Sequence, residues 1–181
     1  MGEIFYGDDG LICHNMNKKI PQNRFVVDIQ ENHQPNSDML LPSAHQLESW
    51  ASTVFEHENL SEAEITLRLV DEAEMQDLNA RYRGKDAPTN VLSFPANVPA
   101  EVALELSFLG DIILCVQVIN QEAQAQAKPL WSHWAHMVVH GVLHLLGYDH
   151  VNEQDAVIME KKEILILNAL GFADPYSDDE E

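Results

Sequence analysis

The stretch LWSHWAHMVVHGVLHLLGYDH, residues 130–150, decides the fold expected of this 181-residue chain. It is apolar on almost every side from Leu130 to Leu146, a pattern typical of a helix buried at the centre of a domain. Gly147 follows, and glycine readily adopts the left-handed conformation that ends a helix. We therefore expect a central helix over 130–146, followed by a reversal of the chain.

Outside this stretch, the hydrophobic patterns predict alternating strands and helices. Strands are expected at 24–30, 64–70, 89–95 and 110–116, and helices at about 43–58, 71–83, 117–127 and 152–170. This order predicts an α+β fold, in which a small mixed four-stranded sheet packs with about five helices around the central histidine-bearing helix.

Three histidines in this stretch have the spacing of metal ligands. His140 and His144 are four residues apart, so both imidazoles project from one face of the helix. The reversal at Gly147 can bring His150 to the same point. Three neutral imidazoles can bind zinc at ~2.0–2.1 Å and leave a fourth tetrahedral position for water, as a catalytic site requires. The spacing therefore predicts one zinc ion rather than three unrelated histidines, and imidazole ligands favour zinc over magnesium.

Other residues near these histidines have less definite roles. His133 and His136 precede them on the same helix and are expected to pack or hydrogen-bond nearby, with His136 as a possible fourth ligand. Asp149 is a candidate for orienting a ligand histidine through its other ring nitrogen. The spacing also matches the HExxHxxGxxH pattern of metzincin proteases. However, Gly141 stands where those proteases carry their general base, which argues against peptide hydrolysis.

Charge alone argues against a nucleic-acid partner, because 30 acidic residues against 10 basic ones give a net charge of −20. Arg81, Arg83 and Lys85 nevertheless form one local basic cluster. Composition favours the interpretation that these residues only occupy an exposed turn. The alternative is that a polyanion binds at this cluster.

The length of the chain suits a single domain. We expect a loose N-terminal extension over 1–22, one metal-dependent hydrolase domain over 23–172, and an acidic tail over 173–181. No stretch approaches the ~18–20 apolar residues of a membrane span, and the N-terminus lacks the features of a signal peptide. Cys13 and Cys115 are read as reduced thiols, so we expect a cytoplasmic protein.

Three blocks of the sequence resemble the YbeY family of rRNA maturation factors, which are metal-dependent endoribonucleases specific for single strands. The block HGVLHLLGYDH (140–150) is similar to the family signature. LNARYRGKDAPTNVLSFP (78–95) and LGDIILC (109–115) resemble two further blocks of the family. The blocks occur in the family's order, and the resemblance spans about residues 64–171.

The resemblance implies a zinc site at His140, His144 and His150, and a functional arginine at Arg83. It also implies roles in 16S rRNA 3′-end maturation, 70S ribosome quality control and ribosome assembly. The partners would then be ribosomal RNA, the ribosome, and ribosomal or assembly proteins. We accordingly expect His140 and Arg83 to be catalytic, and Arg81, Arg83 and Lys85 to bind the substrate.

Two other functions stay open at this stage. The protein could be a non-catalytic ribosome-assembly factor with a structural zinc, whose acidic surface contacts basic ribosomal proteins. It could also be a metalloprotease-like hydrolase, against which Gly141 argues. The general base is open as well, between Asp149 and hydroxide on the zinc.

Overall fold

The computed structural model describes residues 24–33, 39–96 and 107–177 of the chain. The expected extension over 1–22, the end of the expected acidic tail and Cys13 lie outside these ranges. The elements in chain order are β1 (Arg24–Asn32), α1 (Ala44–His57), β2 (Glu62–Val70), α2 (Glu72–Arg83), β3 (Val91–Pro95), β4 (Phe108–Cys115), α4 (Val116–Ala125), α5 (Leu130–Leu145) and α6 (Glu153–Ala169). Each expected element is present, with its ends shifted by two residues at most.

The four strands form one mixed sheet in the order β1-β2-β4-β3. β1 pairs with β2 and β2 with β4 in parallel, whereas β3 pairs with β4 in antiparallel orientation. β3 therefore lies at one edge of the sheet. Within the ranges that the structure describes, the α+β class and the mixed four-stranded sheet with five helices are confirmed.

Local sequence explains where the first two helices begin and end. Ser43 caps α1 through a capping box with Gln46, and the Asp71 side chain caps α2 by accepting from the backbone N–H of Glu74. Gly84 ends α2 with a positive φ of 70°, a conformation that glycine adopts without a steric penalty. Gly84 therefore places Arg81 and Arg83 in the last turn of α2.

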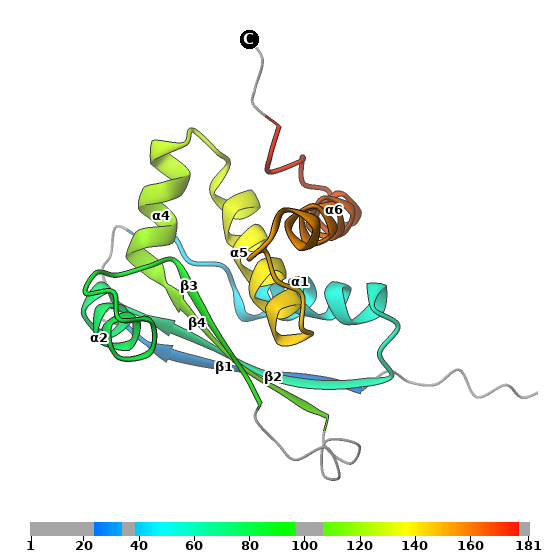
Figure 1. The fold of residues 1–181 in the computed structure, drawn as a ribbon, viewed down its shortest axis with the longest axis horizontal. Helices are drawn as coiled ribbons and strands as arrows, with labels where there is room; N and C mark the ends of the chain where they lie inside the picture. The colour runs from blue at the N-terminus through cyan, green and yellow to red at the C-terminus, as the bar shows by residue number, and fades with distance from the viewer. Residues whose placement is uncertain (1–23, 34–38, 97–106, 178–181) are drawn as a thin grey trace, which may run out of the picture.

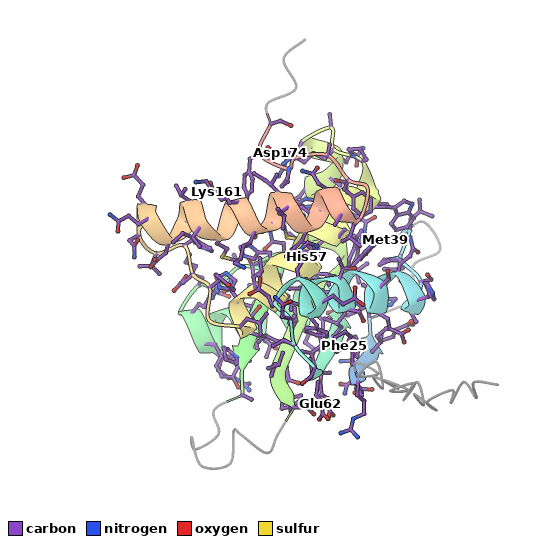
Figure 2. All side chains as sticks on the ribbon, turned by 90° about the vertical axis from the view of Figure 1, so that its right-hand side faces the viewer. Phe25, Met39, His57, Glu62, Lys161 and Asp174 are labelled. Carbon is purple, nitrogen blue, oxygen red and sulfur yellow. The ribbon has the colours of Figure 1, made fainter. Side chains whose placement is uncertain are left out.

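The two faces of the sheet are covered differently. α1, α5 and α6 lie together on one side, and α2 lies at the lower left of the view in Figure 1. In Figure 2, α6 with Lys161 lies above α1, and α1 lies above β1 with Phe25. The larger core fills the α5 side, while a smaller cluster on the other face packs against α2. Among the described residues, no helix combines the length and the apolar character needed to cross a membrane.

Helix α5 is the central helix that its apolar sequence predicts. Eleven of its sixteen residues are buried, and it contacts α1, α4, α6, β3 and β4. Its close approach to the sheet depends on Gly141, because a Cβ atom there would lie 2.8 Å from Cγ2 of Ile112. The Ser93 hydroxyl of edge strand β3 donates to the Gly141 carbonyl at 3.1 Å. α5 is thus anchored on the sheet immediately after His140.

Candidate metal centre

The last two turns of α5 and the turn that follows bring three imidazoles together. The ring centroid of His140 lies 4.5 Å from that of His144 and 5.4 Å from that of His150, and the other pair is 5.1 Å apart. Gly147 has a φ of 90°, as the helix-ending interpretation requires. His140 and His144 are partly buried, and His150 is exposed. The group therefore opens to solvent on one side.

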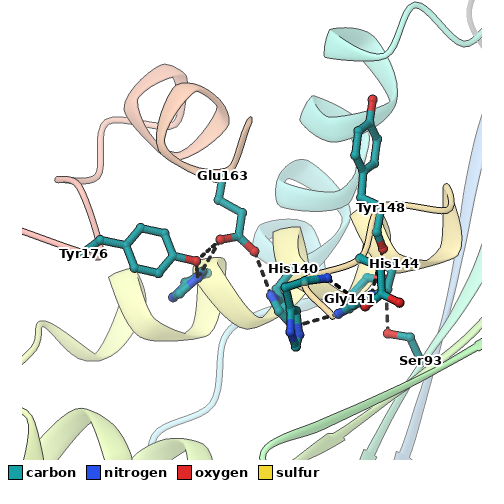
Figure 3. A network of polar contacts seen from close by, with 10 residues as sticks. Ser93, His140, Gly141, His144, Tyr148, Glu163 and Tyr176 are labelled. Carbon is teal, nitrogen blue, oxygen red and sulfur yellow. Dashed lines mark hydrogen bonds and ion pairs between the residues drawn. The ribbon is translucent and has the colours of Figure 1, made fainter. Parts of the chain in front are cut away.

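The orientation of His140 is set by a residue from α6. The Nδ1 atom of His140 donates to Oε1 of Glu163 over 2.7 Å, so its Nε2 atom faces away from that carboxylate. Glu163 is fully buried and also accepts hydrogen bonds from His136 and from the Tyr176 hydroxyl. Burial alone would raise the pKa of Glu163, but the hydrogen bonds from His136 and His140 outweigh it and lower this pKa to about 2. Figure 3 shows this carboxylate between Tyr176 and His140.

The orientation of His144 is set by the turn after α5. Its Nδ1 atom donates to the backbone carbonyl of Tyr148 over 2.9 Å. The Tyr148 side chain is held in turn, because its hydroxyl donates to Glu58 at the end of α1. Lys162 of α6 binds the same carboxylate and lies 5.0 Å from the centre of the Tyr148 ring. Three segments of the chain therefore hold this turn in place.

The geometry of these nitrogens fits a metal ion. The Nε2 atoms of His140 and His144 are 3.0 Å apart, close to the ~3.3 Å expected for two nitrogens on one tetrahedral zinc at ~2.0–2.1 Å. One ligand atom from each of the three histidines lies within 4.8 Å of the others. Burial and the neighbouring His140 and His150 lower the pKa of His144, which favours the neutral form that binds metals. The group can therefore hold a metal ion.

A comparison with models of known protein families assigns the chain to one of them. The family model for the endoribonuclease YbeY matches residues 30–171. The chain belongs to the YbeY family. This membership implies an endoribonuclease that processes rRNA, which agrees with the resemblance seen in the three sequence blocks.

One solved structure shares the fold of this chain. The solution structure of a protein from Thermotoga maritima matches with a TM-score of 0.51 and 23% sequence identity. The match covers 83% of this chain and 99% of the other. At this level of identity the comparison shows a shared fold and says nothing about activity.

The position of Gly141 separates this YbeY-family site from a metzincin protease. Its Cα faces the sheet, where any side chain would collide with Ile112 and approach the Ser93 hydroxyl. The glutamate that metzincins carry here has no room in this packing. The packing of α5 against β4 therefore requires a glycine at this position. A glycine there also means that the general base of the proteases is missing.

Other polar residues near the site have clear partners. His133 contacts Glu122 at 2.9 Å, and this hydrogen bond lowers the pKa of Glu122 despite partial burial. His136 contacts Glu163 at 3.4 Å, so both histidines bond nearby as expected. His136, His140 and Glu163 also lie close enough to share an ion, although hydrogen bonds already account for their contacts.

The expectation for Asp149 is wrong. Its carboxylate accepts from the backbone N–H of His150 at 2.7 Å, and within the described part of the chain it bonds to no imidazole. The role expected of it, orienting a ligand ring, belongs to Glu163 and the Tyr148 carbonyl. Sequence patterns did not single out Glu163. The only signal for it was an acidic residue next to the apolar run ILIL of α6.

The basic cluster lies at the end of α2 and in the turn after it. Arg81, Arg83 and Lys85 are exposed, and none of them forms an ion pair or a side-chain hydrogen bond with another described residue. In the described ranges, no hydrogen bond or ion pair joins them to the three histidines. The basic cluster is linked to the histidines along the chain. The turn after α2 leads into edge strand β3, where the Ser93 hydroxyl donates to the Gly141 carbonyl next to His140.

Proposed function

We propose that this protein is a zinc-dependent endoribonuclease that cuts single-stranded RNA during 16S rRNA 3′-end maturation. Its further roles would be in 70S ribosome quality control and ribosome assembly in the cytoplasm. The observation that carries the proposal is the convergence of His140, His144 and His150 in a chain of the YbeY family. Family membership supplies the substrate class, and the three imidazoles supply a site for the cofactor.

His140, His144 and His150 would hold the zinc. When bound by three imidazoles, zinc supplies Lewis-acid activation of water near neutral pH. The contribution of the chain is to keep the imidazoles neutral and correctly oriented. Glu163 holds His140 by its Nδ1 atom, and the Tyr148 carbonyl holds His144 in the same way. Both side chains therefore present Nε2, with little freedom to rotate away.

Arg83 would bind the scissile phosphate. A guanidinium can donate two parallel hydrogen bonds to phosphate oxygens and stabilise the charge that develops on them. Arg83 is exposed and has no partner among the described residues that would have to be displaced. Arg81 and Lys85 would add sequence-independent attraction to neighbouring phosphates. This arrangement would give an acidic protein one local surface on which a polyanion can bind.

The test combines metal analysis with cleavage assays. Elemental analysis of the purified protein is expected to give one zinc per chain, and His140→Ala is expected to abolish that zinc. The wild type should cut a defined single-stranded RNA and lose this activity with a chelator, while leaving casein intact. His140→Ala, purified in parallel, is the control for contaminating ribonuclease.

Arg83→Glu tests the phosphate role separately. This variant should keep its zinc and lose RNA cleavage, because a carboxylate repels the phosphate that the guanidinium binds. Zinc without cleavage in the wild type would favour the assembly-factor alternative, and hydrolysis of casein would favour the protease. Full zinc and full cleavage by His140→Ala would refute the ligand assignment.

A further inference from the structure

A cavity of about 360 Å³ lies on the face of the sheet opposite α5 and the three histidines. Its walls include Thr66, Arg68 and Asp111 from the two central strands, Phe94 from β3 and Tyr82 from α2. This volume is within the ~300–1,000 Å³ range of small-molecule sites. The polar and aromatic walls come from separate elements, so the cavity exists only in the folded protein.

Strand register explains why these side chains gather. Thr66 of β2 pairs with Asp111 of β4, and Asp111 pairs with Phe94 of β3, so the three lie in one row across the sheet. Neighbouring strands are ~4.7–4.9 Å apart, so adjacent members of the row are close. Arg68 is two residues beyond Thr66 and therefore points to the same face. The register places a carboxylate and a guanidinium side by side on the cavity floor.

The polar groups of this floor have unused hydrogen-bonding capacity. Asp111 is partly buried, yet its carboxylate has no hydrogen bond or ion pair with another described residue. Arg68 pairs with Glu74, which leaves most of its five N–H donors available. A partly buried carboxylate without a partner is costly unless a ligand or water supplies donors. A phosphate cannot be that ligand, because Asp111 would repel it.

The wall above the floor is aromatic. Tyr82 and Phe94 pack edge to face with their ring centres 4.9 Å apart. Tyr82 is 60% exposed, although a large aromatic side chain usually gains by burial. Exposed aromatic side chains provide surfaces on which the bases of single-stranded RNA stack. The cavity therefore offers stacking and hydrogen bonding to one planar group.

We propose that this cavity binds a guanine base of the single-stranded RNA substrate, an inference that rests on the proposed function. Guanine carries two neighbouring donors, N1–H and the N2 amino group, which one carboxylate can accept together. Its O6 and N7 atoms accept from arginine. Asp111 would thus bind the donor edge and Arg68 the acceptor edge, while Tyr82 stacks on the ring. The other three bases cannot present two such donors to Asp111.

The cavity and the histidines share edge strand β3. Ser93 points to α5 and bonds to Gly141, whereas its neighbour Phe94 points into the cavity. Because no strand of the described residues lies beyond β3, an RNA chain can pass around this edge from one face to the other. Tyr82 also lies between Arg81 and Arg83 in sequence, so one wall of the cavity and the basic cluster share the end of α2. A base in the cavity would therefore place the cut at a fixed distance from guanosine.

The test is an internal competition between two labelled oligoribonucleotides, one of uridine only and one with a single central guanosine. The metal-loaded wild type should cut the guanosine strand with a roughly tenfold higher kcat/KM and at a fixed offset from the guanosine. Asp111→Asn should lose both the preference and the offset. Tyr82→Leu should slow cleavage of both strands, because stacking does not discriminate between bases.

Asp28→Asn is the matched control. Asp28 is exposed on β1, pairs with Thr66 in the same row and is not one of the cavity's lining residues. Gln30 of the cavity wall donates to it at 2.8 Å, and asparagine keeps an acceptor oxygen for that donor. The Asp28→Asn substitution removes the same charge from the same face of the sheet. This variant should keep both the preference for the guanosine strand and the fixed offset of the cut. Equal cutting of the two strands by the wild type, or an unchanged preference in Asp111→Asn, would overturn the guanine site while the nuclease stands. Failure to cut either strand would overturn the proposed function itself, and the guanine site with it.

Competition by free guanosine monophosphate tests whether the cavity binds a guanosine within an RNA strand or a free mononucleotide. We expect it to compete poorly, because it lacks the neighbouring phosphates that the basic cluster would bind. Inhibition by this nucleotide as strong as that by the guanosine oligoribonucleotide would assign the cavity to a free nucleotide instead of the RNA strand.

Discussion

Replacing Glu163 with glutamine should weaken metal binding at the proposed zinc site without changing any of its three histidines. The carboxylate accepts hydrogen bonds from His136, His140 and Tyr176, all through its two oxygens. A glutamine has one acceptor oxygen, so it cannot serve all three donors. Loss of a partner that orients a ligand histidine costs about 10–100-fold in metal affinity. We therefore expect the zinc dissociation constant of Glu163→Gln to rise about 30-fold, equivalent to ~2 kcal/mol.

The metal-free protein should be affected as well. A buried donor left without its partner costs about 1–3 kcal/mol, so the free energy of unfolding of metal-free Glu163→Gln should fall by about 2 kcal/mol. The zinc constant is measured by competition with a chromophoric chelator, and unfolding by urea titration in the presence of a chelator. The two measurements separate a weakened site from a weakened fold.

Tyr176→Phe is the control for this prediction. It removes one hydrogen bond to the same carboxylate but leaves the 2.7 Å contact between Glu163 and His140. Its zinc affinity should stay within about threefold of the wild type, because the ligand imidazole keeps its partner. A folded Glu163→Gln protein with wild-type zinc affinity would show that the buried carboxylate does not orient His140.

Three further predictions follow from neighbouring contacts. Gly141→Glu should lower the free energy of unfolding in urea by more than about 3 kcal/mol, because its side chain meets Ile112, and it should not hydrolyse casein. Tyr148→Phe should weaken zinc binding in the chelator assay by less than Glu163→Gln does. The backbone carbonyl of residue 148 remains in this variant and can still accept the hydrogen bond from His144. The lowered pKa of Glu122 means that its bond with His133 stabilises the fold above about pH 4.5 and that this stability disappears as pH falls through the lowered pKa. Urea titrations from pH 7 to pH 3 should therefore show Glu122→Gln less stable than the wild type only at the upper end.

The elements of the fold could be predicted because their signals are local. The caps at Ser43 and Asp71 and the glycines at 84 and 147 each act within a few residues, and Gly147 has the left-handed conformation expected of it. The order of the strands has no such signal. It depends on which strands β4 pairs with, and those partners, β2 and β3, are contacts between segments far apart in the chain. The class of fold was therefore predictable, whereas the topology was not.

In the candidate site too, local features could be predicted from the sequence and tertiary contacts could not. Helical spacing alone predicts that His140 and His144 share a face, and the structure brings them together with His150. The partner of His140 lies 23 residues further along the chain, on another helix. Asp149 seemed the natural partner because it is close in sequence, but its carboxylate is taken by the adjacent backbone N–H. Proximity in sequence is a poor guide where a tertiary contact decides the outcome.

Metal binding and the folding of this domain should be linked. The groups that hold the imidazoles come from the end of α1, the turn after α5, and α6. An unfolded chain lacks these contacts, so it cannot present the three Nε2 atoms together, and zinc should bind the folded state far better. A ligand that binds only the folded state adds about 2.7 kcal/mol of stability at 100 times its dissociation constant. Because α1 and α6 pack against the centre of the domain, zinc should stabilise the domain as a whole and not only the end of α5.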